Sequence, residues 1–119
     1  MNKELKEKYI ADAQKWITIQ RPIAEALKFE GCEIFEKDHT HVAFGCCLFY
    51  NCDQFEVEID FGDARTLEDV STFEVFVSEK NDKYPDDWTS GDLNSYEDVR
   101  KMCQLLKEGK KKEALGMFN

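Results

Sequence analysis

Glycine and proline are scarce in this sequence, and they form no ligand-binding loop. The six glycines stand singly and only two prolines occur. No P-loop, no G-x-G-x-x-G, no G-x-S-x-G and no H-E-x-x-H is present. The common phosphate-binding loops, the serine-hydrolase elbow and the zinc-protease helix are therefore excluded. We expect no catalytic residue, no enzyme activity and no cofactor.

Long apolar runs are also missing. None approaches the ~18 residues that a membrane-spanning helix needs, and the first eight residues, MNKELKEK, are charged, unlike the apolar core of a signal peptide. The five cysteines are odd in number and stand in otherwise apolar stretches, unlike the framework of a disulfide-rich secreted domain. These features predict a soluble, cytoplasmic protein with reduced thiols.

Histidine is the rarest candidate metal ligand. His39 and His41 precede Cys46, Cys47 and Cys52, so a zinc site is conceivable. The set contains no C-x-x-C or H-x-x-x-H pair, which would bring two ligands onto one metal from a short segment. The acids near residue 85 lack the order of a calcium loop. We therefore expect no metal site.

Apolar side chains, in contrast, are sufficient for a core. The 119 residues are 42% hydrophobic and 13% aromatic, and a chain of this length buries roughly two-thirds of its unfolded surface. The length matches one domain rather than two. We therefore predict a single domain over residues 1–119.

Helical spacing occurs at the N-terminal end of the chain. Apolar residues three and four apart predict a helix over 3–20. Pro22 disfavours helix at the residue before it, so we expect a break near Arg21 and a second short helix over 22–29, ended by Gly31.

Helical spacing returns near the C-terminus. Asn94 or Ser95 can cap a helix that Gly109 ends, and a last short helix can bury Leu115 and Phe118.

Between the helices the apolar period changes to two, which indicates strands. Turn-forming residues concentrate in 80–93, which predicts a loop that Trp88 anchors to the core. Short connections favour an antiparallel meander. The fold class is α+β, with helices packed on one face of a four-stranded sheet. The predicted strands are 32–37, 41–50, 54–61 and 70–79.

The negative charge is concentrated in the middle of the chain. The net charge is −9, and residues 32–99 alone hold four Lys or Arg against eighteen Asp or Glu, a net of −14. Residues 1–31 carry +1 and residues 100–119 carry +4. This balance opposes binding to nucleic acid or to anionic membranes, because both need Lys and Arg to neutralise phosphate.

The third predicted strand separates acidic from apolar side chains. Its acids alternate with apolar residues, so one face is core and the other is acidic. The fourth strand adds an acid and an exposed phenylalanine to that face, and the following loop is rich in Asp. The candidate partner-binding residues are Glu56, Glu58, Asp60, Glu74, Phe76, Asp82, Asp86, Asp87 and Asp92.

Several functions remain open for such a surface. It can serve only to keep the sheet soluble and to block edge pairing, or it can bind a basic patch on a partner. In size, acidity and element order the chain resembles small inhibitors of bacterial conflict systems, such as immunity proteins and phage anti-defence proteins. That resemblance implies a non-enzymatic inhibitor of a basic protein, for example a nuclease or another nucleic-acid-binding protein. The alternatives are an accessory or scaffolding domain, a small-ligand-binding domain and an enzyme that carries no recognised motif.

Overall fold

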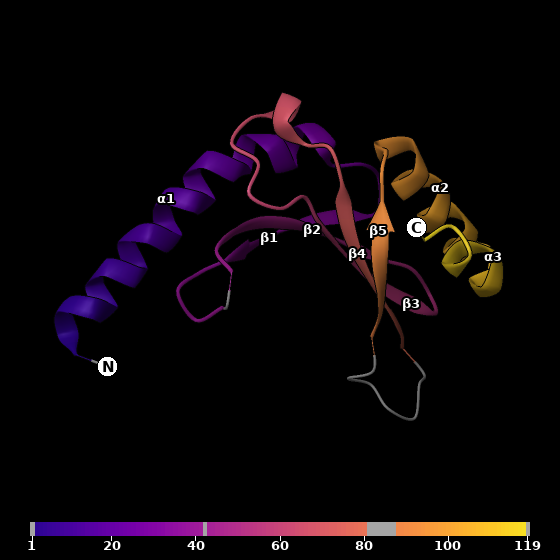
Figure 1. Cartoon of the computed structure of the whole chain (residues 1–119). Helices are drawn as coiled ribbons and strands as arrows, with labels where there is room; N and C mark the ends of the chain where they lie inside the picture. Colours follow the sequence, from indigo (N-terminus) through magenta and orange to yellow (C-terminus); the bar gives the residue numbers. More distant parts are fainter. Residues whose placement is uncertain (1, 42, 81–87, 119) are drawn as a thin grey trace.

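Five antiparallel strands form the centre of the fold in the computed structural model, which describes residues 2–41, 43–80 and 88–118. The strands lie side by side in chain order, so each pairs with the next (Figure 1). Their bounds are β1 (Cys32–Lys37), β2 (Gly45–Asn51), β3 (Phe55–Asp60), β4 (Phe73–Glu79) and β5 (Thr89–Leu93). The α+β class and the antiparallel sheet are confirmed.

The prediction of four strands is wrong, because the segment expected to be a loop contains β5. This strand pairs with β4 from Phe73↔Leu93 to Val77↔Thr89. Its sequence, TSGDL, has no apolar alternation, so nothing in the local pattern indicates a strand. Trp88, expected to anchor the segment in the core, is 37% exposed.

Two strands begin later than their apolar content predicts. β2 starts at Gly45 rather than His41, because Asp38 closes a turn in which its side chain accepts hydrogen bonds from Thr40 and its carbonyl accepts one from the His41 amide. β4 starts at Phe73 rather than Val70, after the short 3-10 helix η1 (Leu67–Asp69).

A single N-terminal helix, α1 (Lys3–Leu27), replaces the two that were predicted. Pro22 lies inside it, and Ile17 before the proline and Ile23 after it are both buried. The helix therefore continues because one face packs against the sheet on both sides of the proline, and this packing outweighs the missing hydrogen bond. Gly31 lies beyond the helix end, in the turn before β1, with a positive φ of 93°.

Gln20 ties α1 to two segments of the sheet region, and it is 2% exposed. Its side-chain amide donates hydrogen bonds to the carbonyls of Gly62 (2.9 Å) and Ala64 (3.0 Å), and its Oε1 accepts one from the Cys46 amide at 3.0 Å. A Cβ on Gly45 would stand 2.1 Å from that oxygen. The glycine therefore gives the buried amide its space.

The C-terminal helices complete the core. Helix α2 (Tyr96–Lys107) starts at Ser95, whose hydroxyl accepts a hydrogen bond from the Asp98 amide, and α3 (Lys111–Leu115) follows Gly109. Buried residues of α1, α2 and α3 join the inward side chains of the strands in one cluster. Ala114 is the residue of α3 that is buried in full, whereas Leu115 and Phe118 are partly buried.

The helices differ in how far they lie over the sheet. The N-terminal part of α1 projects beyond it, whereas α2 and α3 lie together near β4 and β5 (Figure 1). In the described part of the chain, no helix has the length and apolar character to cross a membrane.

Candidate functional site

The face of the sheet opposite the core, here called the outer face, carries side chains from all five strands. Paired residues of antiparallel strands project to the same side, so the register places Phe49, Glu58 and Phe76 in one line across β2, β3 and β4. The three helices bury their side chains in the cluster on the other face. The outer face is therefore the large surface of the sheet that the described helices leave uncovered.

Three carboxylates stand directly opposite one another on this face, and we call them the acidic row. Asp60 of β3 pairs with Glu74 of β4, which pairs with Asp92 of β5. Glu74 and Asp92 are exposed, and neither has an ion-pair partner among the described residues. Like charges placed opposite each other cost some tenths of a kcal/mol per pair. The row therefore lowers the stability of the sheet that carries it.

The acidic row borders an open hollow of about 470 Å³ at one edge of the outer face. The other residues that line it are small: Ala43, Gly62 and Thr72. A long cationic side chain can therefore approach all three carboxylates without displacing a bulky group.

Lys37 of β1 is the one base among the described strand residues of the outer face, and its side chain reaches the acids of β3. Its Nζ lies 3.2 Å from Glu58 Oε2 and 3.1 Å from Asp60 Oδ1, and all three side chains are largely shielded from solvent. Burial lowers the pKa of Lys37, but the attraction of Asp60 and Glu58 outweighs it and the net pKa is raised. Burial, together with the neighbouring Asp60, raises the pKa of Glu58.

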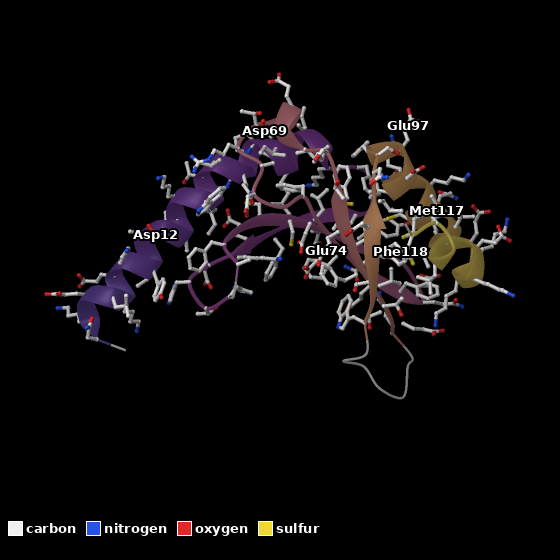
Figure 2. All side chains as sticks on the ribbon, in the orientation of Figure 1. Asp12, Asp69, Glu74, Glu97, Met117 and Phe118 are labelled. Atoms are coloured by element: carbon white, nitrogen blue, oxygen red, sulfur yellow. The ribbon has the colours of Figure 1, made fainter. Side chains whose placement is uncertain are left out.

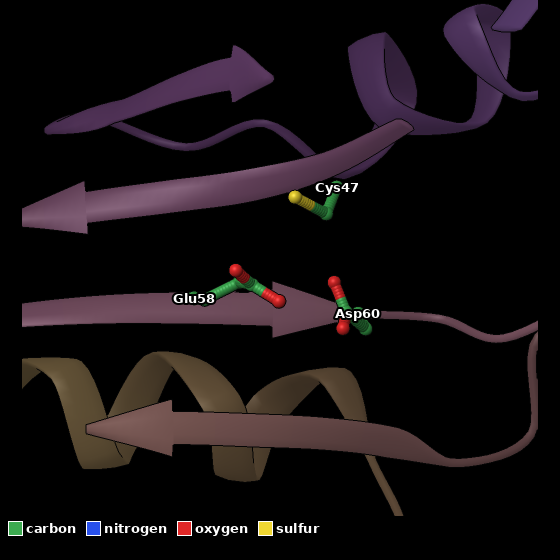
Figure 3. Close-up of side chains that lie close together, drawn as sticks. All are labelled: Cys47, Glu58 and Asp60. Atoms are coloured by element: carbon green, nitrogen blue, oxygen red, sulfur yellow. The ribbon is translucent and has the colours of Figure 1, made fainter. Parts of the chain in front are cut away.

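Cys47 lies beneath this ion pair. Figure 3 shows its sulfur on β2 facing Glu58 and Asp60 on β3. The ligand atoms of these three side chains lie within 4.8 Å of one another, but the ammonium group of Lys37 already binds both carboxylates that a metal ion would need. Burial, reinforced by the charge of Asp60, raises the pKa of Cys47, which keeps it a thiol rather than a nucleophilic thiolate.

Phe35, Phe49 and Phe76 share the outer face with the acids, and we call them the phenylalanine group. The rings of Phe35 and Phe49 meet edge to face at 5.4 Å, and Phe35 also contacts His41 at 5.5 Å. Phe35 is 40% exposed, whereas Phe49 and Phe76 are partly buried. The outer face therefore presents aromatic surface beside unpaired negative charge.

Most of the predicted partner-binding residues come together on this face. The predicted positions of Asp82, Asp86 and Asp87 lie outside the described residues. Lys37 was missed, although the alternation of its strand places it with the acids. The residues that the structure gathers on the outer face are Glu56, Glu58, Asp60, Glu74, Phe76 and Asp92.

Comparison with protein-family models, with curated proteins and with solved structures finds no match to this chain.

Proposed function

We propose that the protein is a non-enzymatic binding protein that engages a Lys- or Arg-rich surface of another protein through the outer face. The acidic row carries this proposal. Asp60, Glu74 and Asp92 repel one another, and Glu74 and Asp92 are exposed with no ion-pair partner in the part of the chain that the structure describes. A cationic partner would remove the repulsion and gain favourable charge interactions at the same place.

The charge of the whole face supports the same partner. Six acids and one base project from the described strands on this side, which gives a net charge of −5. An acidic surface of this kind accelerates encounter with a basic protein. The acids are Glu33, Glu56, Glu58, Asp60, Glu74 and Asp92, and the base is Lys37.

The phenylalanine group suits the side chains that such a partner presents. Lys and Arg carry apolar stems that pack against aromatic rings, and their charged ends interact favourably with ring faces. Phe35 is available for such contacts at the surface, and Phe76 lies two residues from Glu74 on the same face of β4, opposite Glu58.

Proteins that bind nucleic acid are the basic class that best fits this surface. Their Lys and Arg side chains are placed to meet phosphate, and a carboxylate row can compete for them. The proposal therefore includes inhibition of a nuclease or another nucleic-acid-binding protein, as in immunity proteins and phage anti-defence proteins.

The test compares two variants of equal charge change. Glu74→Lys with Asp92→Lys reverses the acidic row, and Glu25→Lys with Glu68→Lys reverses two exposed acids elsewhere. NMR titration with an oligolysine peptide should shift backbone amides of β3, β4 and β5 in the wild type. The shifts should disappear in the row variant and remain in the control.

Affinity capture from cells that contain the natural partner extends this test. We expect a basic protein to be captured by the wild type and by the Glu25/Glu68 control, and to be released by moderate salt. Equal capture by the row variant, or oligolysine shifts located away from the outer face, would show that the acidic row has no binding role. Circular dichroism of each variant verifies that the fold is kept.

A further inference from the structure

A cleft separate from the outer face opens where the chain leaves α1 and where β2 ends, beside α2. It consists of two hollows of about 140 and 270 Å³ that share Glu30, Tyr50 and Lys107. Tyr50 projects to the core side of the sheet, opposite Cys32 and Val57. The cleft and the outer face therefore lie on different sides of the sheet.

Tyr50 is the central side chain of this cleft. It is 6% exposed, and among the described residues its hydroxyl has no hydrogen-bond partner. Enclosed polar side-chain atoms in the described part of the chain all have partners, so the hydroxyl reaches the open space of the cleft. A buried tyrosine usually finds a partner for this group, and here that place is free for a ligand.

Two cations stand on the α2 wall of the cleft. Arg100 and Lys107, seven residues apart on one side of the helix, both line it, with Gln104 between them. Within the described ranges neither has an ion-pair partner. The cleft thus combines two cations with one hydroxyl that has no hydrogen-bond partner among the described residues.

Arg100 lies beside two aromatic rings. Its guanidinium carbon lies 5.7 Å from the centre of the Phe29 ring and 6.0 Å from that of Tyr96. Phe29 in turn stacks on Tyr50 at 5.7 Å, and the Tyr96 hydroxyl donates a hydrogen bond to the Leu27 carbonyl at 2.6 Å. Contact with these rings leaves the N–H groups of the guanidinium free to donate hydrogen bonds to a ligand.

We propose that this cleft binds a small molecule through one oxyanion group, a carboxylate or a phosphate. Arg100 and Lys107 supply the positive charge, and the Tyr50 hydroxyl donates a hydrogen bond to the same group. Glu30 lines both hollows, whereas Asp53 lines only the larger one, so the smaller hollow, which Arg100 also lines, is the place for the anion. Burial raises the pKa of Tyr50, which keeps its hydroxyl a donor at neutral pH.

The turn before β1 shapes the cleft for this purpose. A Cβ on Gly31 would stand 2.8 Å from Cε2 of Tyr50, so a larger residue would push the ring out of its position. Gly31 also has a positive φ of 93°, which side-chain-bearing residues rarely adopt. The backbone of this turn thus fixes the ring whose hydroxyl points to the ligand.

The experiment measures binding of benzoate, phenyl phosphate and inorganic phosphate to the full chain by NMR titration. At least one oxyanion should bind saturably in the millimolar range or tighter, with shifts centred on Tyr50, Gly31 and α2. Preference for benzoate assigns a carboxylate ligand, and preference for either phosphate assigns a phosphate ligand. Benzylamine, a cation of similar size to benzoate, should not bind there.

Variants test whether the proposed hydrogen-bond donors contribute to binding. Arg100→Gln with Lys107→Gln should weaken binding by about tenfold or more, and Tyr50→Phe should weaken it by roughly fivefold. Lys101→Gln, an exposed lysine on the same helix, should leave affinity unchanged. Absence of saturable oxyanion binding, or equal weakening by Lys101→Gln, overturns the proposal. The Glu74/Asp92 variant should bind these probes like the wild type, so failure here is distinguishable from failure of the outer-face proposal.

Discussion

Lys37 determines the electrostatic state of the outer face at the scale of single residues. Its ammonium group lies between Glu58 and Asp60, about 3 Å from each carboxylate. Without it, two half-buried acids two residues apart on β3 would face each other with nothing to balance them. The pKa of Glu58 is already raised by burial and by Asp60 in the presence of this lysine, so the pair is sensitive to its loss.

Replacing Lys37 with methionine should lower stability in a pH-dependent way. Near neutral pH the free energy of unfolding should fall by roughly 1–3 kcal/mol, because half-buried carboxylates lose their partner. The folded-state pKa of Glu58 lies above its unfolded value, so the folded state takes up the proton first and acidification relieves the repulsion. Urea unfolding near pH 7 and near pH 5 should show that most of the loss disappears at the lower pH.

The charge of Lys37 itself affects stability at alkaline rather than acidic pH. Its folded-state pKa is raised, so the stability from its charge is complete below the unfolded pKa and is lost as pH rises through the folded value. Lys101→Met, at an exposed site on α2, serves as the control and should change little at either pH. A loss from Lys37→Met that is equal at both pH values would mean that the side chain only fills space.

Packing between elements explains why β5 exists without an apolar pattern. A Cβ on Gly91 would stand 2.4 Å from Cγ of Phe118, and Figure 2 shows Phe118 beside β5. The ring of the C-terminal segment thus occupies the place of the missing side chain. Glycine weakens a strand on its own, but here it admits an aromatic ring from a distant part of the chain.

Gly91→Ala should destabilise the protein, by roughly 1–3 kcal/mol, because the new methyl group displaces the Phe118 ring. Phe118→Ala should cost a similar amount, through the loss of partly buried apolar surface. The two changes together should cost clearly less than their sum, since the alanine methyl then fills space that the ring has vacated. Chemical denaturation of the four proteins gives the coupling energy. Additive costs would mean that strand and ring do not compete for one space.

Some strands and helices can be predicted from local sequence patterns, and others cannot. The alternation of Phe55, Val57 and Ile59 with acids is local and strong, and it predicts β3 and its two faces as the structure has them. Neither β5 nor the uninterrupted α1 can be predicted in this way. Their stability comes from distant contacts, those of Gly91 with Phe118 and those of Ile23 with the core, which no local window contains.

The candidate sites can likewise be predicted only in part from local sequence patterns. Strand alternation places Glu58 and Asp60 on one face, but only pairing across strands brings Asp92 beside Glu74. The cleft around Tyr50 has no local sequence pattern, because its lining comes from the turn after α1, the end of β2 and the second half of α2. The buried Gln20 is likewise hidden, since its three backbone partners lie more than twenty residues away in the chain.

The charge of the whole molecule is distributed so that repulsion is concentrated on one surface. The outer face carries −5, whereas residues 100–119, which include α3 and the last two thirds of α2, carry +4. Repulsion between exposed carboxylates is reduced by salt, because the Debye length falls from about 30 Å at 0.01 M to about 3 Å at 1 M. Stability of the free protein should therefore depend on salt through the outer face.

Raising sodium chloride from about 0.01 M to about 0.5 M should increase the free energy of unfolding by roughly 0.5–1 kcal/mol. Glu74→Thr with Asp92→Thr should stabilise the protein at low salt by a similar amount and should remove most of the salt response. The matched control, Glu25→Thr with Glu68→Thr, removes the same charge from surfaces outside the acidic row and should keep the response. Urea midpoints at both salt concentrations provide the measurement. If the control loses the response as fully as the row variant, the net charge of −9 rather than the acidic row is its source, and the row would no longer be a place where stability is lowered in favour of binding.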